Sequence, residues 1–185
     1  MHDAALSAQC LASHLNTSPD RVLVASTGVI GNFLPMPRML KGIATAVSAL
    51  NSRGGGAAAR AIMTTDTREK TVALEGRIGG KTVRIGGMAK GSGMIHPQMA
   101  TMLAVITTDV QVAPRELSRY LRHAVDRTFN CLTVDGDTST NDSVAVLANG
   151  ASGAALSDHR SRALFEKGLG MVCEELARAI ARDGE

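Results

Sequence analysis

The chain has 185 residues, of which 44% are apolar and 20% charged, and this is enough to bury a substantial core in a single domain. Its net charge is only +3, and it contains one Tyr, three Phe and no Trp. A nucleic-acid-binding surface needs a basic stripe or aromatic side chains that stack on bases, and neither is evident. The apolar runs are also shorter than the roughly 18 residues that span a bilayer. We therefore expect neither a nucleic acid nor a membrane as partner.

The three cysteines are Cys10, Cys131 and Cys173, an odd number with no CxxC or Cys/His spacing. This pattern favours free thiols in a reducing compartment over disulfides or a zinc site. The first residues, MHDAALSAQC, lack the basic and apolar segments of a signal peptide. The sequence therefore predicts a cytoplasmic protein without a metal site.

The first third of the chain predicts two helices and one strand. Apolar residues at helical spacing indicate a helix over 3–15 and a second helix over 37–50. Between them, RVLVAS (21–26) predicts a buried strand that runs into a glycine-containing turn at 27–31. The second helix is followed by a flexible glycine-rich connector at 51–56.

The remainder predicts strands followed by helices. Short strands are expected over 58–65, 71–75 and 82–88, and the last two form a hairpin across a glycine-rich turn. The strongest strand signal lies at 101–109. Helices are expected over 114–128, which begins with proline, and over 159–182, with a break near Gly168 and Gly170.

A threonine opens the strongest predicted strand, in the stretch MIHPQMATMLAVITTD (94–109). A threonine hydroxyl is a poor nucleophile at neutral pH unless a base lies within hydrogen-bond reach. One solution is to make the threonine the first residue of its chain, because its own α-amino group then accepts the hydroxyl proton. Thr101 could gain such a base if the peptide bond before it were cut.

Four stretches together resemble the core signatures of a known family. They are VLVASTGVIGNFLPM (22–36), AIMTTDT (61–67), KGSGMIHPQMATMLAVITTD (90–109) and FNCLTVDGDTSTNDSVAVLANG (129–150). In this order they resemble the ornithine acetyltransferase family, also called glutamate N-acetyltransferase, of arginine biosynthesis. The resemblance spans most of the chain.

The resemblance implies self-processing at the Ala100–Thr101 bond. Residues 1–100 would then be the α-chain portion and residues 101–185 the β-chain portion of a single domain, with Thr101 as nucleophile. The two portions would stay together as a heterodimer and assemble further. The implied fold is a mixed α/β sandwich of αββα type, with layered mixed sheets flanked by helices and truncated at both ends, because family members are longer.

The resemblance also implies the site and the reaction. Thr27 and Gly28 match the oxyanion-hole pair, Thr64 and Lys90 match substrate-binding positions, and Glu185 matches the acidic residue that engages the substrate's amine. In a ping-pong reaction, an acetyl group passes from N-acetylornithine through the threonine to glutamate. No metal or bound cofactor takes part, and acetyl-CoA is an alternative donor in some members. The other reading open to the sequence is an inactive remnant of this fold that serves as an assembly or binding piece.

The segment DGDTSTND (135–142) offers a competing interpretation as a calcium loop. The ligands of such a loop would be Asp135, Asp137, Ser139 and Asn141. Its sixth position is Thr140 rather than glycine and its twelfth is Val146 rather than glutamate, which argues against an EF-hand. We expect these polar residues to bond to one another and brace the neighbouring site.

Two other residues near the motifs could carry chemistry. His96 is close in sequence to Thr101, but a histidine in such a loop is expected to be exposed. Cys131 has no histidine partner in its motif, so we predict a buried structural thiol.

Overall fold

A computed structural model describes residues 2–29, 31–96, 99–100, 102–137, 139 and 141–184, with only the backbone described at 99 and 100. The chain forms two compact units, residues 1–55 and 56–185, a boundary that the sequence analysis did not predict. Within the described residues, no helix has both the length and the apolar character needed to cross a membrane.

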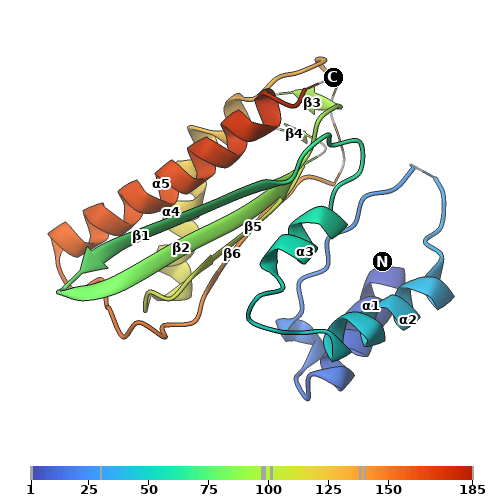
Figure 1. The fold of residues 1–185 in the computed structure, drawn as a ribbon, viewed down its shortest axis with the longest axis horizontal. Helices are drawn as coiled ribbons and strands as arrows, with labels where there is room; N and C mark the ends of the chain where they lie inside the picture. Colours follow the sequence, from blue (N-terminus) through green and yellow to red (C-terminus); the bar gives the residue numbers. More distant parts are fainter. Residues whose placement is uncertain are drawn as a thin grey trace. The chain divides into compact units, whose positions relative to one another are not determined.

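The first unit is helical (Figure 1). Its elements are α1 (His2–His14), a short 3-10 turn η1 (Pro19–Arg21) and α2 (Met36–Ser48). Helices α1 and α2 pack against each other, and the Cys10 thiol lies 3.9 Å from the carbonyl oxygen of Leu40. Both predicted helices of this region are confirmed.

The predicted strand at 21–26 is wrong. After η1 the chain continues without regular structure up to residue 29. Leu23 is 72% exposed and Val24 is 40% exposed, so the apolar run is not buried. A strand needs a partner to pair its backbone groups, and none of the described strands pairs with this segment. A β-branched composition favours a strand, but pairing does not follow from composition.

The second unit is built on a four-stranded mixed sheet in the order β1-β2-β5-β6. The strands are β1 (Lys70–Ile78), β2 (Lys81–Lys90), β5 (Leu103–Thr108) and β6 (Ser143–Ala148). The pairs β1–β2 and β2–β5 are antiparallel, whereas β5–β6 is parallel. The predicted hairpin is confirmed, and its turn consists of Gly79 and Gly80, which both have positive φ angles (58° and 78°) that glycine adopts without strain.

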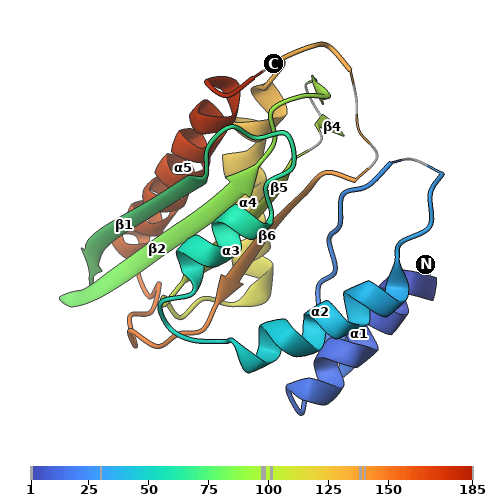
Figure 2. The same cartoon turned by 45° about the vertical axis from the view of Figure 1, so that its right-hand side comes forward.

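Two helices cover one face of this sheet (Figure 2). Helix α4 (Pro114–Asp126) packs on α5 (His159–Ala181) and β6, and α5 packs on β1 and β2. The 3-10 turn η2 (Phe129–Cys131) follows α4. The predicted break in the long helix is wrong, because α5 continues through Gly168 and Gly170. Gly168 is buried against the sheet. A Cβ atom there would lie only 3.2 Å from side-chain atoms of Ile85 and Leu74, so glycine allows close packing.

The predicted strand at 58–65 is also wrong. Residues Gly55–Ala61 form helix α3, with the sequence GGAAARA. Alanine has the highest helix propensity of all residues, and this local preference outweighs the short apolar run that suggested a strand. The chain then passes through an irregular segment into β1.

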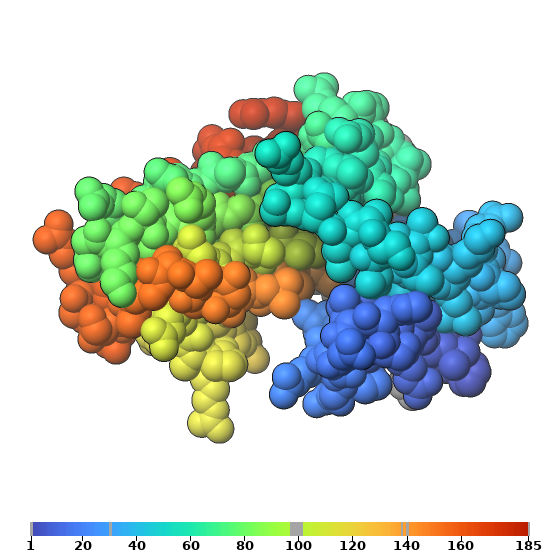
Figure 3. All heavy atoms as spheres, turned by 60° about the horizontal axis from the view of Figure 1, so that its bottom comes forward, coloured from blue at the N-terminus to red at the C-terminus, as the bar shows by residue number. Residues whose placement is uncertain are grey.

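The fold class predicted from the sequence is confirmed as mixed α/β, with a sheet flanked by helices. The described residues provide one four-stranded layer and its helices, together with a two-stranded hairpin of β3 (Ile95–His96) and β4 (Met99–Ala100). The segments that follow β5 and β6 also lie side by side, because the amide of Gln111 donates to the carbonyl oxygen of Ala154 at 2.8 Å (Figure 3).

Candidate functional site

A buried carboxylate connects the two predicted substrate-binding residues of the second unit. The side chain of Asp66 is fully buried, and its Oδ2 atom accepts a hydrogen bond from the amide of Thr64 at 3.0 Å. Its Oδ1 atom accepts from the amide of Gly91, the residue after Lys90, at 2.7 Å. Nearby, the hydroxyls of Thr65 and Ser92 lie 2.6 Å apart. The structure thus brings the segments of Thr64 and Lys90 together.

Lys90 ends strand β2 inside the protein. Its exposed fraction is 0%, and the register pairs it with Leu103, the first residue of β5. Burial lowers the pKa of Lys90, while the negative charges of Asp66 and Asp142 act in the opposite direction. The predicted role of Lys90 as the partner of a substrate carboxylate stays a prediction.

A second buried lysine, Lys70, links Asp66 to Asp183 in an ion network. The Nζ atom of Lys70 lies 2.6 Å from Asp66 Oδ1 and 2.5 Å from Asp183 Oδ2, and all three side chains are at most 1% exposed. Asp183 also accepts hydrogen bonds from the amide and the hydroxyl of Thr67. The network therefore ties the segment before β1 to the end of α5.

The loop before β6 holds both flanks of the predicted cleavage site. Asp135 accepts hydrogen bonds from the amides of Met94 and Ile95, and Asp142 Oδ1 accepts from the amide of Met102 at 2.8 Å. The hydrogen bond from the backbone amide of Met94 is the main cause of the lowered pKa of Asp135. The sequence analysis expected these polar residues to bond to one another and to brace the neighbouring site. Bonds within the loop are present, because Asp135 accepts the amide of Asp137 and Ser139 accepts the amide of Asn141. The two carboxylates also bind the backbone on either side of 97–101.

The calcium-loop interpretation gains no support. Among the described residues, no group of three or more His, Cys, Asp or Glu side chains is arranged to hold a metal ion. The carboxylate of Asp135 instead accepts hydrogen bonds from backbone amides.

Not every predicted site residue can be placed. Thr101 and Glu185 lie outside the described residues, and Ala100 is described only by its backbone, which pairs with Ile95. Thr27 and Gly28 lie in the irregular segment of the first unit, whose position relative to the second unit is not defined. The oxyanion-hole and nucleophile assignments therefore stay predictions.

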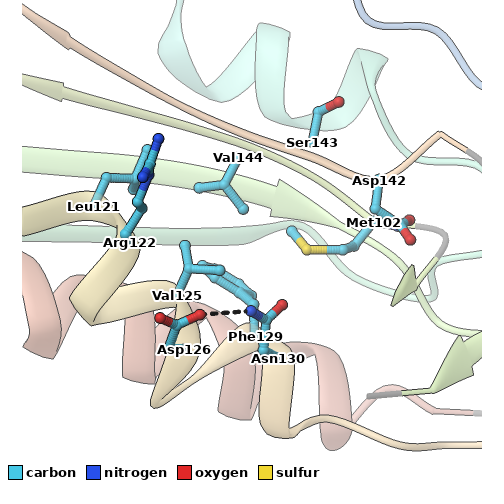
Figure 4. Close-up of a pocket in the computed structure, with 10 residues that line it drawn as sticks. All are labelled: Met102, Leu121, Arg122, Val125, Asp126, Phe129, Asn130, Asp142, Ser143 and Val144. Atoms are coloured by element: carbon cyan, nitrogen blue, oxygen red, sulfur yellow. Dashed lines mark hydrogen bonds between the residues drawn. The ribbon is translucent and has the colours of Figure 1, made fainter. Parts of the chain in front are cut away.

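A cavity of about 330 Å³ lies between α4 and β6, next to the residue that follows Thr101 (Figure 4). Val125 and Val144 point into it from opposite sides, and Asn130 donates to Asp126 at 2.9 Å on one wall. The lining residues are Met102, Leu121, Arg122, Val125, Asp126, Phe129, Asn130, Asp142, Ser143 and Val144. The sequence analysis missed this cavity, because β6 was not predicted.

Three of the reactive side chains that lie outside the ion network are His96, Cys131 and Cys173. His96 is exposed, as predicted, with Nδ1 3.4 Å from the hydroxyl of Thr133. The prediction of a buried Cys131 is wrong, because this residue lies on the exposed turn η2. The buried thiol is that of Cys173, and burial raises its pKa to about 12. Neither cysteine has the environment of a nucleophile.

Sequence comparison decides the family. The model of the ArgJ family matches residues 1–185. The chain belongs to the ArgJ family. This confirms the resemblance to an arginine-biosynthesis family that the four motifs indicated.

Two similar proteins carry the family's name. The "Arginine biosynthesis bifunctional protein ArgJ" of Thermosynechococcus vestitus is 56% identical over 180 residues, which is 96% of this chain and 43% of that protein. The protein of the same name from Synechocystis sp. is 54% identical over 185 residues, which is 99% of this chain and 45% of that protein. The chain thus spans less than half the length of the curated relatives it matches.

A solved structure is also similar. The crystal structure of the arginine biosynthesis bifunctional protein ArgJ from Bacillus halodurans is 41% identical. The match covers 52% of this chain and 51% of that chain, with a TM-score of 0.47.

Proposed function

We propose that this chain carries the nucleophile and part of the substrate site of an acetyltransferase in arginine biosynthesis. The enzyme would transfer an acetyl group from N-acetylornithine to glutamate, giving ornithine and N-acetylglutamate. The names of the relatives support the pathway, and the word "bifunctional" in them supports a second activity, for which we propose acetyl-CoA as donor. No bound cofactor is required, and the free thiols fit a cytoplasmic enzyme.

One observation carries the proposal. The register pairs Lys90 with Leu103, and Leu103 follows Thr101 by two residues. The same end of the sheet also carries the Thr64 segment, through Asp66. Two predicted substrate-binding residues therefore gather where the chain enters β5 directly after the predicted nucleophile.

The chemistry would begin with a cut between Ala100 and Thr101. The α-amino group that is released accepts the hydroxyl proton of Thr101 as its oxygen attacks the acetyl carbonyl. The hydroxyl of Thr27 and the amide of Gly28 would stabilise the oxyanion of the tetrahedral intermediate. When this intermediate collapses, the bond to nitrogen breaks, ornithine takes the proton and leaves, and the acetyl group stays on Thr101.

The second half-reaction reverses these steps with glutamate as nucleophile. Its amine attacks the acetyl ester, and Thr101 leaves with a proton to regenerate the free enzyme. Lys90 would pair with the substrate's α-carboxylate, Thr64 would bind substrate beside it, and Glu185 would engage the amine of ornithine.

Two carboxylates support self-cleavage at this bond. Asp135 accepts the amide of Ile95, before the predicted cleavage site, and Asp142 accepts the amide of Met102, after it. Both flanks are therefore fixed while the bond between them reacts. A reaction within one chain gains most when the reacting atoms are held in place. The products would be residues 1–100 and 101–185, which would remain associated as two chains.

The test is the denatured mass of the freshly purified protein. We expect two fragments, split after Ala100, whose masses add up to the chain plus one water. The Thr101→Ala variant should give only the uncut chain, while the matched control Thr107→Ala, an exposed threonine of β5, should be cut like the wild type. Acetyl transfer from N-acetylornithine to glutamate is then assayed on the cut protein. A single uncut mass in the wild type would contradict the proposal.

The alternative function is an assembly or binding piece of the same fold. It is favoured by the sheet face opposite α4 and α5, where Val105 is 37% exposed and Leu147 is 50% exposed. Such a piece would show neither the cut nor acetyl transfer, and it would associate with another chain through this face. The same mass measurement and assay therefore separate the two functions.

A further inference from the structure

We propose that Asp66 is a positioning residue, which holds Thr64 and the end of β2 at Lys90 from within a buried ion network. The inference rests on the proposed function, because Thr64 and Lys90 are assigned there to substrate binding. It adds three residues to the site to which no role has been assigned so far: Asp66, Lys70 and Asp183.

The first step of the argument is the geometry of the Asp66 carboxylate. Each of its oxygens accepts one backbone amide, that of Thr64 at 3.0 Å and that of Gly91 at 2.7 Å. These amides belong to segments 27 residues apart in sequence. One rigid group thus fixes the distance between the predicted substrate-binding threonine and the residue after the predicted substrate-binding lysine.

The backbone at Gly91 shows why the second bond matters. Its φ angle is +147°, which side-chain-bearing residues rarely adopt, so the position directly after Lys90 favours glycine. Glycine permits this conformation but does not favour it over other conformations. The hydrogen bond from Gly91 to Asp66 selects one of them, and this defines where β2 ends.

The second step is the orientation of Asp66 itself. Its Oδ1 atom also receives the ammonium of Lys70 at 2.6 Å, and that ammonium binds Asp183 at 2.5 Å. All three side chains are at most 1% exposed. Water therefore cannot replace any partner, and rotation of Asp66 would leave buried charges without compensation.

The third step is charge. Burial would raise the pKa of Asp66, but hydrogen bonds from the Gly91 amide and from Lys70 outweigh burial and lower it. The carboxylate is therefore ionised at neutral pH and acts only as an acceptor, which the two amides require. An asparagine at position 66 would offer one acceptor oxygen and one amide that repels a backbone N–H.

The test uses Asp66→Asn, which keeps the shape of the side chain. We expect hydrogen exchange to become about tenfold faster at the amide of Thr64 or of Gly91, whichever loses its acceptor oxygen, and this factor corresponds to a hydrogen bond of about 1.4 kcal/mol. We also expect KM for N-acetylornithine to rise about tenfold or more, with a smaller change in kcat, because binding residues are displaced while the nucleophile is not.

Matched variants separate positioning from general stability. Lys81→Met removes an exposed lysine at the other end of the β1–β2 hairpin and should leave both exchange rates and KM unchanged. Lys70→Met should reproduce the effects of Asp66→Asn, because Asp66 then loses its ionic partner. If Asp66→Asn fails to fold, Asp66→Glu serves instead, since it keeps the charge but displaces the two acceptor oxygens.

The outcomes are distinct. Unchanged exchange at Thr64 and Gly91 in folded Asp66→Asn overturns the positioning role, whatever the activity. Faster exchange with unchanged KM overturns it as well, because the network would then be purely structural. Absence of acetyl transfer in the wild type sinks the proposed function instead, and the exchange rates still decide whether Asp66 holds the two segments.

Discussion

Asp183 shows how a single residue near the end of a helix can organise a distant segment. It lies 113 residues from Lys70 in sequence, yet its carboxylate is the lysine's second partner. It also accepts the amide of Thr67 at 3.0 Å. The end of α5 thereby fixes the segment that carries Thr64, and the stability of the fold and the geometry of the candidate site depend on the same side chain.

We expect Asp183→Asn to lower the free energy of unfolding by about 2–3 kcal/mol, because a buried, charge-assisted hydrogen bond to Lys70 is lost. The matched control is Glu174→Gln, which breaks an exposed pair with Arg178 at 2.6 Å and should change the free energy by less than about 1 kcal/mol. Urea unfolding at neutral pH measures both. Equal effects of the two variants would contradict the assignment of a buried network.

The buried pair of Asp183 and Lys70 also makes the stability of the protein depend on pH. Burial would raise the pKa of Asp183, but hydrogen bonds from Lys70 and Thr67 outweigh it, and the pKa lies below its ordinary value of 3.8. A carboxylate with a lowered pKa in the folded state stabilises the protein above its ordinary pKa, and this contribution is lost as the pH falls through the folded value. The stability difference between wild type and Asp183→Asn should therefore shrink below about pH 4, as urea unfolding across this range would show.

The sequence predicted part of the site and could not predict the rest. Thr64 and Lys90 stand inside recognisable motifs, and the structure brings their segments together. Lys70 and Asp183 stand in no motif, and nothing in a single sequence pairs residues so far apart. Cys131 was expected to be buried because cysteine is usually buried, but the turn at η2 leaves it exposed.

At the scale of elements, the predictions succeeded where periodicity or turn residues gave a clear signal and failed where an apolar run was the only signal. The helices α1, α2, α4 and α5 and the β1–β2 hairpin follow directly from periodicity and turn residues. The strand predicted at 21–26 is wrong because a strand depends on a pairing partner. The strand predicted at 58–65 is wrong because the alanine-rich residues Gly55–Ala61 form a helix. Strand β6 was missed because the polar residues directly before it dominated the interpretation of that segment.

The contact between α5 and the sheet allows a sharp test at this scale. A Cβ atom at Gly87 of β2 would lie 2.9 Å from Leu176 Cδ1, 3.2 Å from Val172 Cγ1 and 3.3 Å from Ile106 Cγ1. We expect Gly87→Ala to lower the free energy of unfolding by about 1–3 kcal/mol, because the buried helix must shift. Urea unfolding measures the change.

The matched control is Gly76→Ala on the neighbouring strand β1. A Cβ atom there meets nothing within 4 Å, so we expect no loss of stability and a small gain from the restricted unfolded chain. A loss at Gly76 as large as that at Gly87 would show that the cost arises from the strand backbone and not from the helix contact.

At the scale of the whole molecule, the core belongs to one unit. Every fully buried member of the hydrophobic cluster among the described residues lies between Ile78 and Ile180. The first unit buries only Ala8 and Ala12 among its described apolar side chains. Because burial of apolar surface is the main favourable contribution to folding, the two units should differ widely in their stability in isolation.

We therefore expect residues 56–185 expressed alone to unfold in one cooperative transition, close to that of the intact chain, and residues 1–55 alone to show none. Circular dichroism during heating measures both. In the intact chain, trypsin should cut first after Arg53, an exposed residue in the turn between the units, and later within the sheet, where Arg84 is held by paired backbone. A non-cooperative melt of 56–185 would mean that the core of this unit needs residues 1–55 to fold, despite the absence of their side chains from the cluster.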